Sequence, residues 1–135
     1  MAEFNSVHEV MGHYYHMYRP TEIKQRIELH VFRKGFKPLW EQFKEGGTWT
    51  LKEDAQFTEK LNVDWRWETS LFNFIGEEFP NSLKGLSLSV RGNGFCTISF
   101  WQDSGDQATK DLILEKLKLV LKLEERSHSI YFKSN

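Results

Sequence analysis

The sequence predicts an α+β domain with helices on one side of a largely antiparallel β-sheet. Segments whose apolar residues recur at helical spacing alternate with segments that alternate apolar and polar residues. One pair of strand-like segments encloses an Asn-Gly dipeptide, which favours a tight hairpin turn. No internal repeat, low-complexity tract or linker interrupts the pattern. A chain of 135 residues fits one domain, so we expect a single domain over residues 1–135.

Three segments carry the apolar stripe of an amphipathic helix. The first covers about 7–18, starts with the capping-box spacing of Ser6 and Glu9, and stops before Pro20. The second has a stripe formed by Val63, Trp67, Leu71, Phe74 and Ile75, with Asn62 as the expected N-cap and Gly76 and Pro80 beyond its end. The third covers about 107–123. Its residues 116–123 also alternate like a strand, but they are good helix formers that follow helix-starting residues.

Period-two alternation predicts the strands. One starts at Ile27 and ends near Lys34, another covers 48–52 and buries Trp49 and Leu51, a hairpin joins 86–90 to 95–101, and the last covers 129–133. Since successive side chains of a strand point to opposite faces, Trp101 should point away from the face that buries Ile98 and Phe100.

Composition excludes several classes of function. A formal net charge of −1 argues against non-specific binding along long nucleic-acid backbones, because that affinity comes mainly from phosphate neutralisation. No apolar run of about eighteen residues is present, so we expect no membrane span. The single cysteine, Cys96, forms no intramolecular disulfide, and the opening residues lack a secretory apolar core. We therefore expect a reducing compartment, most simply the cytoplasm.

Trp40 followed by Glu41 is the pair with the clearest chemical meaning. A guanine methylated at N7 carries a delocalised positive charge, so an indole face attracts it by stacking and by cation–π interaction. The same base offers two adjacent N–H donors on its Watson–Crick edge, and one carboxylate accepts both. The alternative interpretation is that Trp40 is a partly buried core aromatic beside a surface charge.

Three segments, VFRKGFKPLWEQFKEGGTWTL, WRWETSLFNFIGEEF and LSVRGNGFCTISFWQD, together carry a more specific signal. In order and spacing they resemble the cap-binding translation initiation factor 4E family across nearly the whole chain. The resemblance implies a curved antiparallel sheet with three helices on its convex face. It also implies that the concave face holds the 7-methylguanosine cap of messenger RNA.

The resemblance assigns roles to four residues. Trp40 corresponds to the second of two indoles that sandwich the base, and Glu41 to the carboxylate that holds its N1 and N2 donors. Trp101 corresponds to the indole that touches the N7 methyl group. Arg91 stands where the family places an arginine toward the cap phosphates, and its planar guanidinium suits a phosphate.

The chain departs from the family pattern on the cap side. It begins after the position of the first sandwiching indole and of most of the first two strands, and loss of one stacking face weakens base binding by about 5- to 150-fold. Asn93 and Phe95 stand where lysines usually assist the arginine. A sheet without its first strands exposes unpaired edges, so we expect self-association by strand exchange or rearranged terminal residues.

A second surface follows from the same resemblance. The family binds a short helical motif of a scaffold or repressor protein on its convex side, through a tryptophan in the first helix and leucines in the second. Here Met11 takes the tryptophan position with Val7 nearby, and Glu68 and Phe72 take leucine positions. Met and Phe still line a hydrophobic groove; alternatively, Met11 fills core space.

Other constellations indicate little chemistry. His13 and His16 lie one turn apart with Glu9, but without a further ligand cluster we read them as a solvated helix face. Asp64 and Glu68 suggest ordinary surface acids. We therefore expect no enzyme, no cofactor and no metal. The leading hypothesis is a cap-binding protein of translation initiation; the alternative is a degenerate family member that acts through protein contacts alone, and a nucleotide-directed enzyme is a remote third.

Overall fold

The computed structural model describes residues 26–54, 60–91, 95–123 and 129–135. The helix expected over 7–18, with Val7 and Met11, lies outside these residues, as does the Asn93-Gly94 turn.

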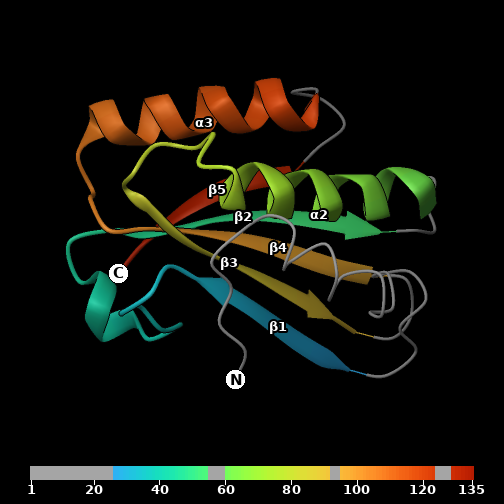
Figure 1. Ribbon diagram of the computed structural model, residues 1–135, viewed down its shortest axis with the longest axis horizontal. Helices are drawn as coiled ribbons and strands as arrows, with labels where there is room; N and C mark the ends of the chain where they lie inside the picture. Colours follow the sequence, from blue (N-terminus) through green and yellow to red (C-terminus); the bar gives the residue numbers. More distant parts are fainter. Residues whose placement is uncertain (1–25, 55–59, 92–94, 124–128) are drawn as a thin grey trace.

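Five strands form one sheet in the order β1-β3-β4-β2-β5 (Figure 1). Their bounds are β1 Ile27–Phe32, β2 Gly47–Asp54, β3 Leu83–Val90, β4 Phe95–Gln102 and β5 Ser129–Ser134. All four strand pairings are antiparallel, which confirms the expected sheet type. The hairpin predicted around residues 91–94 is the β3–β4 pair, and the final strand pairs with β2.

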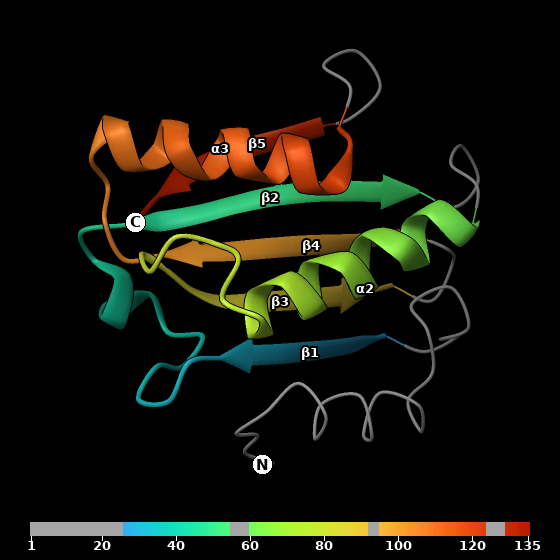
Figure 2. The same cartoon turned by 45° about the horizontal axis from the view of Figure 1, so that its top comes forward.

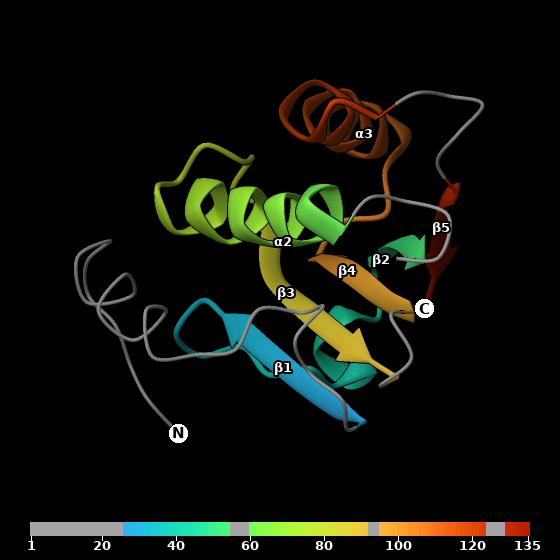
Figure 3. The ribbon, with the colours of Figure 1, turned by 90° about the vertical axis from the view of Figure 1, so that its right-hand side faces the viewer.

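Two α-helices, α2 (Lys60–Ile75) and α3 (Gln107–Leu121), lie in the described part of the chain. Both cover the same face of the sheet, α2 above β3 and β4 and α3 above β2 and β5 (Figures 2 and 3). This layering confirms the α+β class, with two of the three expected helices in view. A short 3₁₀ helix, η2 (Trp40–Phe43), precedes β2 at a position where the sequence predicted only a connection.

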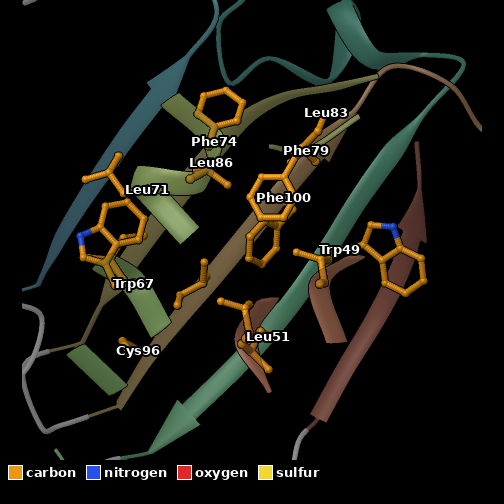
Figure 4. Packing of buried hydrophobic residues seen from close by; sticks show 14 of the residues in the cluster. Trp49, Leu51, Trp67, Leu71, Phe74, Phe79, Leu83, Leu86, Cys96 and Phe100 are labelled. Carbon is orange, nitrogen blue, oxygen red and sulfur yellow. The ribbon is translucent and has the colours of Figure 1, made fainter. Parts of the chain in front are cut away.

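The core lies between the helices and the sheet (Figure 4). The sheet contributes Trp49 and Leu51 from β2, and both are buried as predicted. The stripe predicted for the second helix is confirmed, because Val63, Trp67, Leu71 and Phe74 all lie in this cluster. Removal of these apolar surfaces from water is the main force that holds the two layers together. The indole N–H of Trp49 donates to Gln102 Oε1 at 2.8 Å, so the core leaves this donor satisfied.

The beginning of α2 differs from the predicted signal, whereas its end agrees with the prediction. The helix starts at Lys60, so Asn62 lies inside the first turn and is not its cap. Asp64, expected at the surface, is only 7% exposed, because tertiary packing covers this side of the helix. At the other end α2 stops at Ile75, directly before Gly76, as predicted, and Glu77 adopts the left-handed conformation, with φ of 59°. Backbone bonds from Glu77 to Phe74 and from Glu78 to Asn73 close this end.

The start of α3 agrees with the prediction. Asp106 caps the helix: its carboxylate accepts from the backbone N–H of Thr109 at 3.0 Å and from the Thr109 hydroxyl at 2.7 Å. The Ser104 hydroxyl donates to the same carboxylate. Hydrogen bonds lower the pKa of Asp106 to about 2, and the bond from Ser104 has a larger effect than those from Thr109. The ionised carboxylate therefore fixes the entry to α3.

No helix in the described ranges is long and apolar enough to cross a membrane. Among the described strands, β1 and β5 each pair with one neighbour, so the sheet has two edges there. Self-association through such edges, like the single-domain organisation of residues 1–135, stays a prediction.

The cap at Asp106 makes stability depend on pH. In the unfolded chain an aspartate titrates near 3.9, whereas here its pKa is about 2. The stabilisation is therefore fully present above about pH 4 and is lost as the pH falls through 2. We expect Asp106→Asn, a neutral cap, to lower the melting temperature at pH 6 but to converge with the parent protein near pH 2. Thermal unfolding followed by circular dichroism over this range checks it, and a constant difference would contradict it.

Candidate functional site

The face of the sheet opposite the helices, here called the open face, is polar and carries a hollow of about 300 Å³. Strand alternation places Ser87 and Ser89 of β3 on this face, because their neighbours Leu86, Leu88 and Val90 are buried in the core. The residues that line the hollow are Glu28, His30, Pro38, Ser87, Leu88, Ser89, Ser99 and Trp101. They come from β1, β3, β4 and the loop before η2.

Trp101 lies on the open face at one end of the hollow, as the alternation of β4 predicts. Ile98 and Phe100 are fully buried on the opposite face. The Trp101 ring lies 5.2 Å from the ring of Phe43 and 5.7 Å from that of Phe32, measured between centroids. Its indole N–H donates to Ser87 Oγ at 3.0 Å. These contacts fix the indole plane while leaving the side chain half-exposed.

An aromatic cluster of Phe32, Phe36, Phe43 and Trp101 supports this end of the open face. Phe43, the last residue of η2, is fully buried within it. Aromatic rings bury large areas at defined angles. The contacts of Phe43 with Phe32 and Trp101 therefore help to hold η2 against the sheet. The sequence analysis did not identify Phe43, since no periodic pattern surrounds it in the connection.

The turn η2 begins at Trp40, so the structure places the backbone of Trp40 and Glu41 beside the aromatic cluster. Glu41 is exposed, and no hydrogen bond or ion pair engages its carboxylate in the part of the chain that the structure describes. Gln42 secures the preceding loop: its side chain accepts from the Lys37 N–H at 2.6 Å and donates to the Gly35 carbonyl at 3.3 Å. These two hydrogen bonds hold the loop before η2 against the residue that follows Glu41.

A polar chain crosses the floor of the hollow. His30 Nδ1 lies 2.8 Å from Ser87 Oγ, the same oxygen that accepts from Trp101. The direction of the His30–Ser87 hydrogen bond depends on the imidazole tautomer, and Nε2 of the same ring lies 3.8 Å from a Glu28 carboxylate oxygen. The sequence analysis missed His30 and Ser87 because only the pairing register brings them together.

Arg91 lies on the same face but far from Trp101. It follows the end of β3 and lies six positions beyond Gly85, the partner of Trp101, a span of about 20 Å. Its guanidinium is exposed and sits 5.7 Å from the Phe95 ring centroid. The hollow ends at Ser89, about 7 Å short of Arg91 along the strand. The structure therefore aligns Trp101, the hollow and Arg91 along one direction.

Two of the four residues expected to bind a protein partner lie on the other side of the sheet. Glu68 and Phe72 belong to α2, which covers the helical face of the sheet (Figure 3). Both are half-buried, and Phe72 packs against the core cluster. Val7 and Met11 are outside the described residues. The described ranges contain no group of three or more His, Cys, Asp or Glu residues arranged to hold a metal ion.

Comparisons with known proteins identify relatives of this chain. The family model for eukaryotic initiation factor 4E matches residues 1–135. Drosophila melanogaster initiation factor 4E1 is 30% identical over 137 aligned residues, covering 98% of this chain and 51% of the relative. The Nicotiana tabacum isoform 4E is 27% identical over 133 residues, covering 95% of this chain and 64% of the relative. The chain thus spans about half to two-thirds of the length of these relatives.

Solved structures agree with the fold. Caenorhabditis elegans eIF4E-3, in a complex with the 4E-binding protein Mextli, superposes with a TM-score of 0.87 at 21% identity, covering all of this chain and 79% of that one. Ascaris suum eIF4E-3, in a complex with the m7G cap, also gives 0.87, at 23% identity, covering all of this chain and 77% of that one. At such identities the likeness establishes the architecture of the sheet and helices.

Gly85 is required where the aromatic cluster crosses the sheet. A Cβ added there would lie 2.3 Å from two carbons of the Phe32 ring. We expect Gly85→Ala to destabilise the fold by about 1–3 kcal/mol, because the Phe32 ring must leave its place beside Trp101. The same substitution in a Phe32→Ala background should cost less. Urea unfolding of the four proteins of this double-mutant cycle measures the coupling, and additive effects would contradict the contact.

Proposed function

Because this chain belongs to the eukaryotic initiation factor 4E family, we propose that it binds the 7-methylguanosine cap of messenger RNA and acts in translation initiation. Membership of a family of initiation factors agrees with the expectation of a binding protein rather than an enzyme. The observation that carries the proposal is Trp101. It is held at the end of an open hollow, beside the turn that presents Trp40 and Glu41.

The proposed base contact uses the two indoles. The cationic ring of 7-methylguanine stacks on Trp40, and Trp101 faces its N7 methyl group. Phe43 and Ser87 orient Trp101 before any ligand arrives, so little rotamer freedom is lost on binding. An electron-rich ring favours the methylated base over neutral guanine, since only the former carries the positive charge.

The proposed edge contact is made by Glu41. Its exposed carboxylate accepts from the N1 and N2 donors of the base, and a carboxylate that accepts two bonds at once gives both strength and geometric selection. A base without the N2 amino group loses one of these bonds. The hydrogen bonds of Gln42 to the preceding loop help to place the backbone that carries Glu41.

The remaining parts of the cap run along the open face. The serine-lined hollow offers hydroxyl groups to the ribose, and Arg91 at its far end meets phosphate oxygens. Ascaris suum eIF4E-3, whose fold this chain shares, is solved with the m7G cap and with the m2,2,7G cap. We extend cap binding to this chain as a proposal, together with a cytoplasmic location, where messenger RNA is translated.

Intrinsic tryptophan fluorescence tests the proposal. We expect 7-methyl-GTP to quench the emission saturably and GTP to do so far more weakly. Trp40→Ala should lower the affinity for 7-methyl-GTP by about 5- to 150-fold through the lost stacking face. Glu41→Gln should lower it by about 10- to 100-fold, since charge-assisted bonds are replaced by weaker ones.

Glu45→Gln is the matched control, because Glu45 is an exposed acid that follows η2 by two residues. It should leave the affinity unchanged. Equal responses to the methylated and unmethylated nucleotides, or no response at all, would remove the cap-binding proposal. The alternative of a degenerate member that acts through protein contacts would then stand.

We further propose that the helical side receives a short helical motif of a scaffold or repressor protein, through Val7, Met11, Glu68 and Phe72. The placement of Glu68 and Phe72 on α2, opposite the hollow, supports this second surface. A motif bound on the helical side leaves the open face free for capped RNA, so the protein partner and the RNA can bind at the same time. Caenorhabditis elegans eIF4E-3 is solved with the 4E-binding protein Mextli.

A charge placed in this surface should prevent docking. We expect Met11→Asp to weaken capture of a helical-motif peptide by about tenfold or more, because a carboxylate would be buried without a partner. Leu119→Asp, at a 75% exposed leucine of α3, serves as the control and should change nothing. Fluorescence anisotropy measures binding of the peptide, and circular dichroism verifies that each variant is folded. Unchanged binding of the peptide by Met11→Asp would exclude this surface.

A further inference from the structure

Tyr131 of β5 presents an aromatic ring on the open face, beyond the hollow. Its neighbours along the strand, Ile130 and Phe132, pack against the core cluster on the other side. Alternation therefore directs Tyr131 away from the helices, and its side chain is 43% exposed. The exposed part of this ring is therefore available to a ligand.

Two lysines flank this ring on the same face. Lys52 of β2 places its ammonium 5.5 Å from the Tyr131 ring centroid. Lys133 follows Tyr131 by two residues along β5, so its side chain leaves the same face of the sheet. Both lysines are exposed. An aromatic ring between two cations is the arrangement that accepts a base together with its flanking phosphates.

The strand register connects this patch to the candidate cap site. Trp101 pairs with Thr48, and Thr48 pairs with Lys133, so the three residues form one row across β4, β2 and β5. The next row contains Ser99, which lines the hollow, then Thr50 and Tyr131. Two strand spacings separate the hollow from the patch, a distance of about 10 Å. Half-buried hydroxyl side chains of Thr48 and Thr50 cover the surface between them.

We propose that this patch, formed by Lys52, Tyr131 and Lys133, binds the single-stranded RNA that follows the cap nucleotide. Tyr131 stacks on a base, while Lys52 and Lys133 contact phosphates on either side. The inference rests on the proposed cap binding, which sets where the chain enters the open face. A β-sheet surface with exposed aromatics is a known platform for unpaired RNA bases. An acidic peptide would use the lysines but would leave the ring face unused.

The patch is compatible with the overall charge of the protein. With a formal net charge of −1, the chain as a whole is not basic, so RNA without a cap should bind weakly. A local pair of lysines adds affinity only when the cap already holds the RNA in place, because the second contact is then intramolecular. The patch therefore lengthens the footprint on capped RNA without creating general affinity for nucleic acid.

The test compares 7-methyl-GTP with a 7-methylguanosine-capped pentanucleotide by tryptophan quenching and anisotropy. The capped RNA should bind more tightly than 7-methyl-GTP. Tyr131→Leu should lower the affinity for the capped RNA by about 5- to 150-fold and leave the affinity for 7-methyl-GTP unchanged. Tyr131→Phe keeps the ring face and should restore binding of the RNA. Thermal unfolding verifies that each variant is folded.

Salt dependence gives a readout independent of Tyr131. Lys133→Gln should reduce the slope of log affinity against log salt by about 0.7 for the capped RNA, as expected for one lost phosphate contact on a single strand. Lys122→Gln is the matched control, because Lys122 is an exposed lysine whose ammonium lies 5.8 Å from the Trp65 ring of α2 on the helical side. It should leave the slope unchanged.

The outcomes separate this inference from the cap proposal. If 7-methyl-GTP binds but the pentanucleotide adds no affinity, or if Tyr131→Leu weakens both ligands equally, the patch is overturned and cap binding stands. If 7-methyl-GTP fails to bind, the cap proposal fails; loss of the remaining weak RNA binding in Tyr131→Leu would then retain the patch only as a weak RNA contact that does not depend on the cap. Competition by a polyglutamate peptide of equal charge, as strong as that by RNA, would also overturn the patch.

Discussion

The strict alternation of side chains along β4 is the constraint on which the rest of the structure depends. Cys96, Ile98 and Phe100 enter the core beneath the helices, while Ser99 and Trp101 face the other way. A shift of one residue in the register with β3 would exchange these sets and bury Trp101. The core therefore fixes the orientation of the open face, because burying the apolar set allows only one register. Any binding role of the open face is set by packing on its far side.

The aromatic cluster of Phe32, Phe36, Phe43 and Trp101 positions η2 next to the sheet. Loops carry much of the binding chemistry of proteins, yet they are positioned only by what they pack against. Here Phe43 and Phe32 bring η2 next to Trp101, and Gly85 leaves the space that Phe32 occupies. The residues proposed to contact the cap base, Trp40 and Glu41, therefore depend on side chains that touch no ligand. Such supporting contacts determine how well the loop is preorganised.

The two proposed kinds of recognition use opposite faces of the sheet. The open face is lined by hydroxyl, aromatic and basic side chains, a composition suited to a charged, planar and ribose-bearing ligand. The helical face instead carries the amphipathic elements α2 and α3 over the core (Figure 3). Since the sheet itself lies between them, a ligand on one side leaves the other accessible. This arrangement permits RNA and a protein partner to be held together.

The sequence by itself determined the strands, both described helices, the core stripe from Val63 to Phe74 and the face on which Trp101 lies. All of these follow from periodicity, which is local. Only the tertiary structure decided that Phe43 anchors η2, that Ser87 joins His30 to Trp101, and that Tyr131 shares a face with the hollow. It also corrected the start of α2 at Asn62 and the burial of Asp64. These features depend on strand register and on contacts between residues distant in the chain, which a pattern of neighbouring residues does not encode.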